Sequence, residues 1–423
     1  MVLSMAINIL SHIISFLNGF TGWLKDLSPL EFFTIFWPLL IFDLVRSVGK
    51  CLILLIQALY RRFKPKREYI NFSPKVTLII PAHNEEKVIT RSIEAALETD
   101  YENKEIIVVD DGSNDRTFEL AYPYAKMGLI KLLRRDVASG SKAGALNFGL
   151  KFATGDIIIT VDADTLIERN AIKEIIKSLS DPNVRAVSGN VRVLRGEHGL
   201  NNLLVKLQAY EYLVSLELGR RFNALINTLL IISGAFGAFW KEHVLSLGEY
   251  DTDTITEDFD ITIKVRKLGK RLAFAENAIA WTFVPETWRD WRRQRIRWSK
   301  GQVESLWKHR NLFFGGKFDL MLVLAVYDMV LMDIFLLFIR LGWFIYIALF
   351  LQPTLIYIIF LSLILYFIME LIIVITAGAL SPRKSDLKRA YLAPIMILFY
   401  RPYYSIIRFN AYLQWIMRKK VSW

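Results

Sequence analysis

The chain has 423 residues, of which 53% are hydrophobic, and its formal net charge is +12. This is too apolar for an ordinary soluble enzyme, and the apolar runs crowd residues 1–60 and 319–417 while the stretch between them alternates apolar and polar residues. The single cysteine, Cys51, excludes an intramolecular disulfide and a cysteine-based zinc site. We therefore expect membrane segments on both sides of a globular domain.

The N-terminal region contains two apolar stretches. Residues 30–60 are long enough to span the hydrocarbon core of a bilayer as a helix. The run from Ala6 to Phe20 is shorter, and a signal peptide is the competing interpretation. A signal peptide needs a basic start and a small-residue cleavage site, and because neither is evident here we interpret the run as a further span. Charged residues that interrupt the longer stretch are expected to face other helices, water or headgroups: Asp43, Arg46 and Lys50.

From Lys75 the sequence alternates short β-rich runs with amphipathic segments, which is typical of a parallel sheet covered by helices. The sequence therefore predicts an α/β fold for this region. The expected strands are residues 76–81, 106–109, 130–133 and 157–161. The expected helices between them are residues 86–98, 115–126 and 142–152.

Polar residues follow three of these strands. His83-Asn84-Glu85 comes after the first strand, Asp110-Asp111-Gly112-Ser113 after the second, and Asp162-Ala163-Asp164 after the fourth. A single such segment is most often a turn, but ligands bind beyond the carboxyl ends of parallel strands, so three segments at one edge indicate a site. The first strand is not followed by Gly-x-Gly-x-x-Gly, so the fingerprint of a dinucleotide-dependent oxidoreductase is missing.

The carboxylates at this edge suit a hard cation. Asp162 and Asp164, with Asp111 nearby, have the chemistry to hold Mg²⁺ or Mn²⁺ bound to a diphosphate and to contact the nucleoside, although a solvated acidic loop is the alternative. Lys142 opens the third predicted helix, so its ammonium group and the helix N-terminus can both meet a phosphate. A plain exposed lysine is the competing interpretation there.

Two later segments also carry chemistry. Thr256-Glu257-Asp258 offers a carboxylate that can accept a hydroxyl proton. Residues 288–298 are rich in arginine, which can neutralise a leaving diphosphate, and in tryptophan, which can stack on a sugar ring. A membrane-surface amphipathic helix and a nucleic-acid patch are alternatives for the second segment.

The C-terminal region is expected to contain two spans, residues 319–351 and 353–378, separated by a tight turn at Gln352-Pro353. Residues 391–417 contain arginine and proline, so a broken, tilted or interfacial helix competes with a simple crossing. Basic clusters beside the spans predict a cytosolic central domain, and attraction to anionic lipid explains the net charge better than nucleic acid does.

These motifs, in this order, resemble the inverting glycosyltransferases of family 2 with a GT-A fold, specifically the membrane-bound processive synthases of cellulose, chitin, hyaluronan and poly-N-acetylglucosamine. The resemblance covers about residues 74–310 and is greatest to the bacterial poly-β-1,6-N-acetylglucosamine synthases. It rests on the strand-end segments described above and on four further motifs: Lys142-Ala143-Gly144-Ala145-Leu146-Asn147, Ser233-Gly234-Ala235-Phe236, Thr256-Glu257-Asp258 and Gln294-Arg295-Ile296-Arg297-Trp298.

The resemblance implies roles for individual residues. Those expected to bind the donor nucleotide or its diphosphate are Asn84, Glu85, Asp111, Lys142, Asp162 and Arg297. Those expected to bind the metal, Mg²⁺ or Mn²⁺, are Asp162 and Asp164. The general base is expected to be Asp258, with Glu257 beside it. Those expected to border the acceptor are Gln294, Trp298, Ser233, Gly234 and Phe236.

The resulting hypothesis is an inverting transfer of a sugar, N-acetylglucosamine, from a UDP-sugar to a growing β-linked polysaccharide, coupled to membrane translocation. Expected partners are the UDP-sugar, the polysaccharide, membrane lipid and an accessory subunit, without nucleic acid. The expected domains are membrane helices at 1–62, a cytosolic GT-A domain at 63–285, interfacial helices at 286–318 and a membrane region at 319–423. A non-processive enzyme that glycosylates a lipid, either ceramide or a polyprenyl phosphate, is the nearest alternative.

Overall fold

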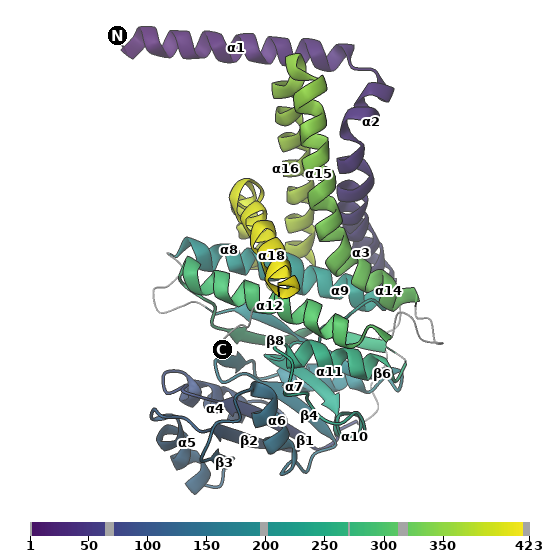
Figure 1. Cartoon of the computed structure of the whole chain (residues 1–423). Coiled ribbons are helices and arrows are strands. Elements are labelled where there is room, and N and C mark those ends of the chain that lie inside the picture. Colours follow the sequence, from purple (N-terminus) through teal and green to yellow (C-terminus); the bar gives the residue numbers. More distant parts are fainter. Residues whose placement is uncertain (1, 64–71, 195–201, 270, 312–319, 418–423) are drawn as a thin grey trace.

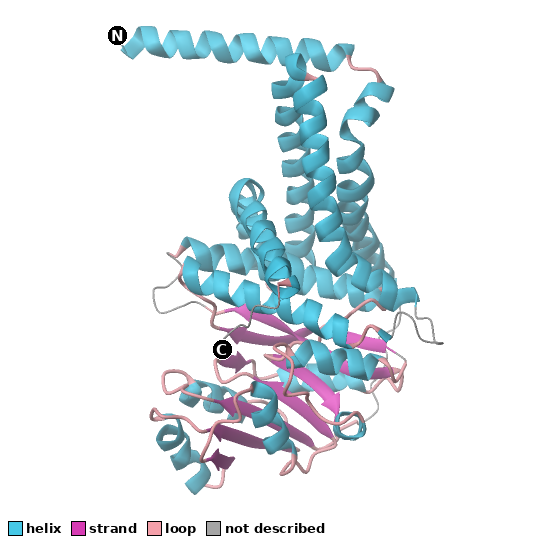
Figure 2. Ribbon diagram, in the orientation of Figure 1, coloured by secondary structure: helices cyan, strands magenta, loops and turns pink. Residues whose placement is uncertain are grey.

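The computed structural model describes residues 2–63, 72–194, 202–269, 271–311 and 320–417. An upright bundle of helices stands on an α/β domain, and the first helix, α1 (Val2–Asp26), lies crosswise at the far end of the bundle (Figure 1). All of the strands lie in the lower half of the molecule (Figure 2). The two regions that differ in composition along the sequence are therefore two layers of one structure.

The α/β domain is built on an eight-stranded sheet with the order β3-β2-β1-β4-β7-β6-β8-β5. β3, β2, β1 and β4 are parallel, β7 is antiparallel to both of its neighbours, β6 is parallel to β8, and β5 is antiparallel to β8. The strands are β1 (Val76–Ala82), β2 (Lys104–Asp111), β3 (Lys131–Arg135), β4 (Ile157–Val161), β5 (Thr165–Ile167), β6 (Val184–Val193), β7 (Phe236–Trp240) and β8 (Arg271–Thr282).

The first half of this domain confirms the predicted elements. The four parallel strands occur where the sequence placed them, and the three intervening helices are α4 (Ile89–Leu97), α5 (Thr117–Lys126) and α6 (Lys142–Leu150). β1 is buried along its whole length because helices cover both faces of a parallel sheet, which explains its uninterrupted apolar sequence. α6 approaches β1 closely: a Cβ at Gly149 would lie 2.8 Å from the side chain of Ile79.

The second half of the domain adds helices that the sequence did not anticipate: α7 (Ala171–Leu179), α8 (Leu203–Glu211), the π-helical turn η3 (Tyr212–Leu218), α9 (Gly219–Leu225), α10 (Lys241–Ser246) and α11 (Glu257–Arg266). The segment from α8 to α9 joins the sheet to the bundle. Tyr210, in α8, packs in one apolar cluster with Trp291 and Tyr400, and the Trp291 Nε1 donates to the Tyr400 hydroxyl at 2.9 Å.

Residues 288–298 begin a long helix, α12 (Trp288–Lys308), whose N-cap Thr287 accepts a hydrogen bond from the Asp290 backbone N–H at 3.2 Å. α12 lies between the sheet and the bundle, beside the last helix α18 (Arg401–Ile416) (Figure 1). The last part of the predicted interfacial region, residues 312–318, lies outside the described residues.

The bundle contains α2 (Pro29–Pro38), η1 (Leu39–Leu44), α3 (Val45–Phe63), α14 (Leu320–Val326), η4 (Tyr327–Leu331), α15 (Met332–Phe350) and α16 (Leu355–Leu380). The predicted turn at Gln352-Pro353 is confirmed by the short 3-10 turn η5 (Gln352–Thr354). The charges in the first stretch face other helices, as expected. Asp43 pairs with Arg340, and Arg46 donates to the Asp328 carboxylate at 2.7 Å.

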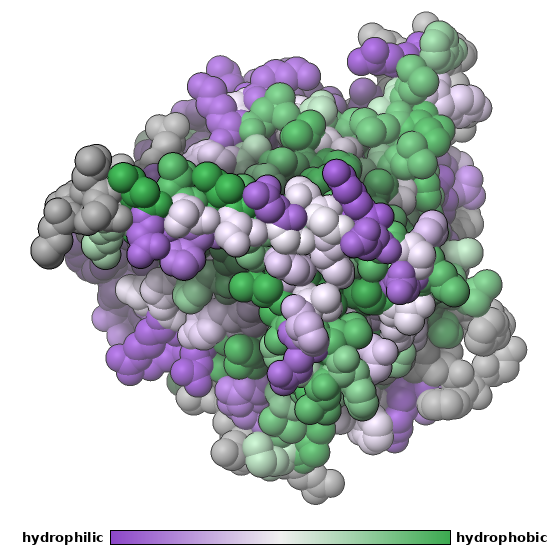
Figure 3. All heavy atoms as spheres, turned by 90° about the horizontal axis from the view of Figure 1, so that it is seen from above, coloured by the Kyte–Doolittle hydropathy of each residue, from purple (hydrophilic) through white to green (hydrophobic). Residues whose placement is uncertain are grey.

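Within the described residues, Gln352–Leu380 is the one helix that is both long and apolar enough to cross a membrane, while Leu320–Met329 and Phe335–Phe350 are apolar but shorter. The expected span at Ala6–Phe20 falls in α1, which lies across the bundle instead of along it (Figure 1). Figure 3 looks down on this end of the molecule and shows extensive apolar surface there. Among the described residues, one of the expected spans therefore meets the length and apolarity of a membrane helix, and the number of spans stays a prediction.

The segment after α16 is interrupted, which is one of the alternatives that its sequence left open. It consists of the 3-10 turn η6 (Lys384–Leu392), α17 (Ala393–Ile395), the π-helical turn η7 (Met396–Tyr400) and α18. α18 leans over α12, near the α/β domain, and does not stand parallel to α15 and α16 (Figure 1). The basic residues 418–420 lie outside the described residues.

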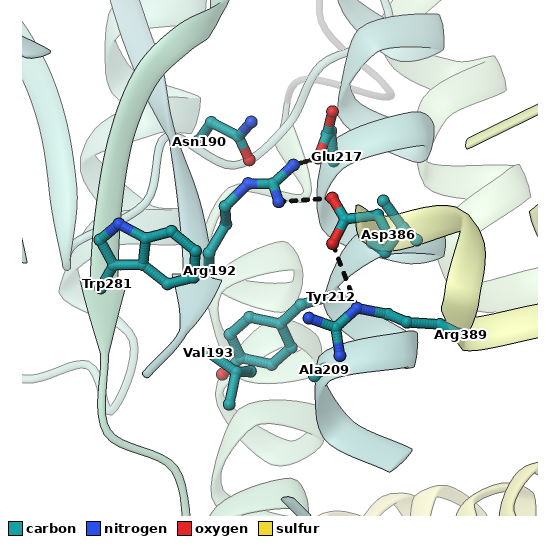
Figure 4. Close-up of a pocket in the computed structure, with 10 residues that line it drawn as sticks. Asn190, Arg192, Val193, Ala209, Tyr212, Glu217, Trp281, Asp386 and Arg389 are labelled. Atoms are coloured by element: carbon teal, nitrogen blue, oxygen red, sulfur yellow. Dashed lines mark hydrogen bonds and ion pairs between the residues drawn. The ribbon is translucent and has the colours of Figure 1, made fainter. Parts of the chain in front are cut away.

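A buried cluster of charges fixes the α/β domain to the segment that follows α16. Arg192 of β6 pairs with Glu217 of η3 and, at 2.6 Å, with Asp386 of η6 (Figure 4). It also donates to the Ser381 hydroxyl at 2.8 Å. Arg389 approaches Asp386 from the more exposed side at 3.2 Å. Because three separate elements supply the charges, this cluster holds the bundle in a defined position over the sheet.

Candidate functional site

The polar segments that follow β1, β2 and β4 meet at one edge of the sheet, as predicted, because these three strands are parallel neighbours in the order β2-β1-β4. β7 runs antiparallel to β4, so the residues that precede β7 arrive at the same edge. The Asp162 backbone N–H accordingly donates to the Ala235 carbonyl at 3.4 Å. The topology thus assembles the candidate site from segments that are far apart in the sequence.

The segments after β1 and β2 support each other. Asn84 has a positive φ of 57°, a conformation that asparagine tolerates better than most residues. Its backbone N–H donates to the Ser113 hydroxyl at 3.0 Å, and its side-chain oxygen accepts from the Asn114 N–H at 2.9 Å. His83 lies with Nδ1 2.8 Å from the Asp111 carbonyl oxygen. This arrangement presents Asn84 and Glu85 at the sheet edge.

Asp111 is buried and anchors the loop that leads into α6. Its carboxylate accepts from the Ser139 backbone N–H at 3.0 Å and from the Ser139 hydroxyl at 2.6 Å, and it pairs with Arg135 at 3.0 Å. These contacts fix the loop against the end of β2. Asp111 therefore shapes the pocket edge in addition to the nucleotide contact expected from the sequence.

Three carboxylates crowd the centre of this edge. Burial, together with the charges of Asp164 and Asp162, raises the pKa of Glu85 to about 7. Burial and the charge of Asp162 raise the pKa of Asp164 to about 6, although the Asp164 carboxylate accepts from the Thr282 hydroxyl at 3.3 Å. Like charges held this close favour a cation between them.

The residues at this edge fit a divalent metal that is shared with a diphosphate. Asp162 and Asp164 offer hard oxygen ligands, and Mg²⁺ is commonly held by one or two carboxylates together with substrate phosphates. In the part of the chain that the structure describes, no group of three or more acidic, histidine or cysteine side chains is arranged to hold a metal alone. Asp111 therefore does not complete such a group with the two aspartates.

Lys142 lies between two acidic parts of the site, one that contains Asp162 and one that contains Glu257. It begins α6, whose N-cap Ser141 accepts from the Gly144 N–H at 3.2 Å, and its ammonium group pairs with Asp162 and, at 3.1 Å, with Glu257. Burial alone would lower the pKa of Lys142, but these carboxylates raise it above its usual value. Lys142 is therefore a fixed cation and not a plain exposed lysine.

Asp258 is the second residue of α11 and is positioned by backbone groups. One carboxylate oxygen accepts from the Gly234 N–H at 3.1 Å, and the other accepts from the Phe259 N–H at 2.8 Å. Glu257, directly before it, is almost completely buried, and burial together with the charge of Asp258 raises its pKa. Asp258 is only partly buried, so it is the more accessible of the two carboxylates.

Gly234 has a specific steric role in this arrangement. A Cβ at this position would lie 2.9 Å from Lys142 Nζ, 3.1 Å from Asp258 Cβ and 3.2 Å from Glu257 Oε1. We expect Gly234→Ala to displace these side chains, to lower turnover by about tenfold or more, and to leave the fold intact. Steady-state kinetics beside circular dichroism checks this, and Gly22→Ala, at an open position without a positive φ, is the control for the added methyl group. Full activity in Gly234→Ala would contradict the assigned contact.

Arg220 is a component of the site that the sequence analysis missed. It is only 8% exposed, it donates to the Ser188 hydroxyl at 3.3 Å, and the same hydroxyl accepts from the Ser233 N–H at 3.3 Å. Burial lowers the pKa of Arg220 to about 10, and the nearby charge of Asp258 opposes that change. An arginine inside an unpredicted helix carried no motif that could have identified it.

Four of the five expected acceptor residues lie on α12 or directly before β7. In α12, the central residue is Arg295, which was part of the quoted motif but received no role. Arg295 is fully buried, pairs with Glu211 at 2.6 Å, and donates to Gln294 Oε1 at 3.0 Å. Its guanidinium also stacks 4.3 Å from the centre of the Trp298 ring. Arg295 thereby fixes the orientation of Gln294 and Trp298. Arg297, which was expected to bind the leaving UDP, lies on the same helix and is half-buried.

Phe236 corrects one expectation. It is completely buried at the start of β7, and its ring fills the space beside Gly189, where a Cβ would lie 2.1 Å from the ring. It therefore belongs to the core of the sheet and does not line an acceptor pocket. Ser233 and Gly234, which precede β7, do lie at the site.

The comparisons with known proteins agree with this geometry. Residues 77–244 match the family described as glycosyl transferase family 2. The chain is 34% identical over 232 residues to poly-beta-1,6-N-acetyl-D-glucosamine synthase of Staphylococcus aureus and 32% identical over 232 residues to that of Staphylococcus epidermidis. Each alignment covers 55% of this chain and 55% of the relative, so the chain spans about half the length of the curated relatives it matches.

Among solved structures, the chain is similar to the mannosyltransferase PcManGT from Pyrobaculum calidifontis, which was determined in complex with GDP-Man and Mn²⁺. The match has a TM-score of 0.56 and 22% sequence identity, and it covers 89% of this chain and 97% of the other. This similarity shows a shared GT-A-like fold.

Proposed function

We propose that this chain, which carries a glycosyl transferase family 2 domain at residues 77–244, transfers a sugar from a UDP-sugar to a hydroxyl group of a growing β-linked glycan. The observation that carries the proposal is the position of Asp258 at the same sheet edge as Lys142 and the paired carboxylates Asp162 and Asp164. The names of the staphylococcal relatives support N-acetylglucosamine as the sugar.

In this proposal Asp258 accepts the proton of the acceptor hydroxyl. The hydroxyl oxygen then forms a bond to C1 of the donor sugar, while the bond from C1 to the diphosphate oxygen breaks and UDP leaves with the electron pair. Because this is a single displacement, an α-linked donor gives a β linkage. The Gly234 N–H keeps the Asp258 carboxylate in place for the transfer.

The charge of the leaving diphosphate is neutralised by cations at the same edge. Lys142 and the N-terminus of α6 face the acidic centre, and Arg297 is assigned to the leaving UDP. Mg²⁺ or Mn²⁺, held by Asp162 and Asp164, supplies further positive charge when bound. The Mn²⁺ in the mannosyltransferase structure supports this assignment. Asn84 and Glu85 are assigned to the nucleoside side of the pocket.

We further propose that the bundle lies in a membrane and that α1 lies along its surface. α3, α15 and α16 expose large apolar side chains in this bundle, as lipid-facing helices do. Examples are Ile56, Phe344, Leu349, Phe367 and Ile375. The positions of α12 and α18 between the bundle and the sheet agree with an interfacial layer (Figure 1).

Removal of divalent metal tests the paired-carboxylate assignment. We expect a chelator to lower UDP affinity by about tenfold or more, because the diphosphate then meets Asp162 and Asp164 without a cation between them. Asp164→Asn should reduce the metal dependence, whereas Asp181→Asn, outside the site, should retain it. Isothermal titration with UDP, with and without Mn²⁺, makes the measurement. Equal UDP affinity under both conditions would remove the metal from the account.

Product analysis tests the proposed acceptor. The purified protein is incubated with radiolabelled UDP-N-acetylglucosamine, and the product is partitioned between organic solvent and water and sized on a gel. The proposal predicts material with many sugars per chain. An organic-soluble product that carries a single sugar would instead support a non-processive enzyme acting on a lipid.

A further inference from the structure

A cavity of about 840 Å³ lies between the bundle and the α/β domain. This volume is within the range of pockets that bind small molecules. Residues of α3, α9, α14, α15, α16 and α18 contribute to its walls. Its apolar lining on the bundle side includes Ile41, Leu324, Leu337, Ile373 and Phe409. The cavity therefore offers a place for a hydrocarbon chain that enters from between the helices.

The charged lining of this cavity favours an anion. Its basic residues are Arg46, Lys50, Arg220, Arg340, Arg401 and Arg408. Its acidic residues are Asp43, Glu211 and Asp328. Asp328 is already paired with Arg46 and Lys50, and Asp43 with Arg340. Two lining residues form ion pairs with residues outside the lining: Arg401 pairs with Glu370, and Glu211 pairs with Arg295. The negative charge of Glu370 and the positive charge of Arg295 cancel, so these pairs do not change the balance of the lining. Six basic residues against three acidic ones leave an excess of positive charge in the lining of the cavity.

Arg220 differs from its sequence neighbour Arg221 in its ion pairing. Arg221 forms ion pairs with both Glu217 and Glu276, whereas Arg220 has one hydrogen bond, to the Ser188 hydroxyl, and no carboxylate within ion-pair distance among the described residues. A buried cation that has no carboxylate in direct contact is costly, and for Arg220 the longer-range charge of Asp258 offsets the effect of burial only in part. An anionic group in the cavity would supply a direct counter-charge.

The end of the cavity at Arg220 adjoins the candidate catalytic site. Arg220 is close enough to Asp258 for their charges to interact, and Ser188 connects Arg220 to the Ser233 backbone beside Gly234. A headgroup bound at Arg220 therefore lies next to the proposed general base. The opposite walls of the cavity belong to the apolar helices.

We propose that this cavity binds an anionic membrane lipid, with its headgroup at Arg220 and its hydrocarbon chain between the helices of the bundle, and that the sugar acceptor reaches Asp258 on such a lipid. The second half of this statement rests on the proposed function, while the first half does not. The ligand class is a lipid phosphate, whose anionic oxygens match the guanidinium group.

Direct binding tests the site without any donor sugar. The full chain, purified in detergent, is titrated with farnesyl phosphate, farnesol and inorganic phosphate, and binding is measured by native mass spectrometry. We expect farnesyl phosphate to bind more tightly than either of the others by on the order of tenfold to a hundredfold, since only it offers both the anion and the chain. Equal binding of farnesyl phosphate and farnesol would overturn the anionic site.

Variants assign the headgroup contact to Arg220. Arg220→Gln should lose the preference for farnesyl phosphate over farnesol, and Arg220→Lys should keep most of it. Arg293→Gln, which removes a charge from an exposed position of α12, should bind as the wild type does. UDP affinity reports whether each variant is folded. If Arg220→Gln fails to fold, Arg220→Lys takes its place: its preference for farnesyl phosphate should be measurably smaller than that of Arg293→Gln, because an ammonium group cannot form the bidentate contact, and equal preference in these two variants would contradict the proposal.

Kinetics test the delivery of the acceptor. The rate of UDP release is measured with N-acetylglucosamine linked through diphosphate to a farnesyl chain, and with the neutral octyl N-acetylglucosaminide. We expect a lower KM for the anionic acceptor by about tenfold or more, and we expect Arg220→Gln to abolish this difference. Equal KM values would overturn acceptor delivery by this site. Absence of UDP release with both acceptors would instead count against the proposed function, and the binding result would still decide the lipid site.

Discussion

Asp258→Asn is expected to reduce sugar transfer by about 10² to 10⁴-fold while UDP binding is retained. The amide cannot accept the hydroxyl proton, and general bases contribute rate enhancements of this size. The oxygen of the introduced amide can accept from only one of the two N–H groups, Gly234 or Phe259, that the carboxylate binds, so one hydrogen bond is lost and the UDP titration checks that the pocket is kept. Turnover is measured by UDP release, and affinity by titration with UDP.

The matched control is Asp253→Asn. Asp253 lies just before α11 and is exposed, and its main contact is an ion pair with Lys308 at 2.6 Å. This variant should therefore retain activity. Undiminished activity in Asp258→Asn would exclude this residue as the base, and a parallel loss of UDP binding would indicate that the substitution disturbs the pocket and not only the proton transfer.

Arg192→Met is expected to destabilise the folded chain by about 3–5 kcal/mol. The substitution leaves Glu217 and Asp386, each 2% exposed, without the cation that lies between them, and breaking a buried ion pair by removing one partner costs this much. Because the three residues come from β6, η3 and η6, we expect the bundle and the sheet to separate at lower denaturant concentration (Figure 4). Unfolding of the detergent-solubilised protein followed by tryptophan fluorescence makes the measurement.

Arg389→Met is the control for this prediction. Arg389 contacts only Asp386 in this cluster, at 3.2 Å, and its side chain is more exposed, so the expected cost is below about 1 kcal/mol. Replacing Glu217 by Gln and Asp386 by Asn in the Arg192→Met background should recover part of the lost stability. Equal effects of the Arg192 and Arg389 substitutions would show that the buried cluster does not hold the two layers together.

The parallel half of the sheet was predictable because its signals are local. Apolar runs of strand length alternate with amphipathic helices, so β1, β2 and β4 and the residues that follow them could be placed from the sequence alone. The topology then brings Glu85 and Asp162 to one edge without further information. This is why most of the expected donor residues meet in the structure.

The remaining features depend on tertiary packing, which periodicity does not encode. Phe236 is the last residue of Ser233-Gly234-Ala235-Phe236, which resembles an acceptor motif, but only its pairing partner β4 and its neighbour Gly189 determine that the ring is buried. Arg220 forms its hydrogen bond with Ser188, which is 32 residues away in the sequence. For α1, apolar length indicates an affinity for a membrane or a core but says nothing about its direction relative to the bundle.

The most direct test of the central claim is UDP release by the detergent-purified chain, with and without Mn²⁺, from UDP-N-acetylglucosamine, UDP-glucose, UDP-glucuronate and UDP-galactose. The account predicts metal-dependent release from UDP-N-acetylglucosamine, with the sugar recovered in a β-linked product. Release from another donor would keep the mechanism and change the sugar. Absence of release from all four donors, in the presence of both the lipid-linked and the neutral acceptor, would contradict the proposal that this chain is a sugar transferase using UDP donors.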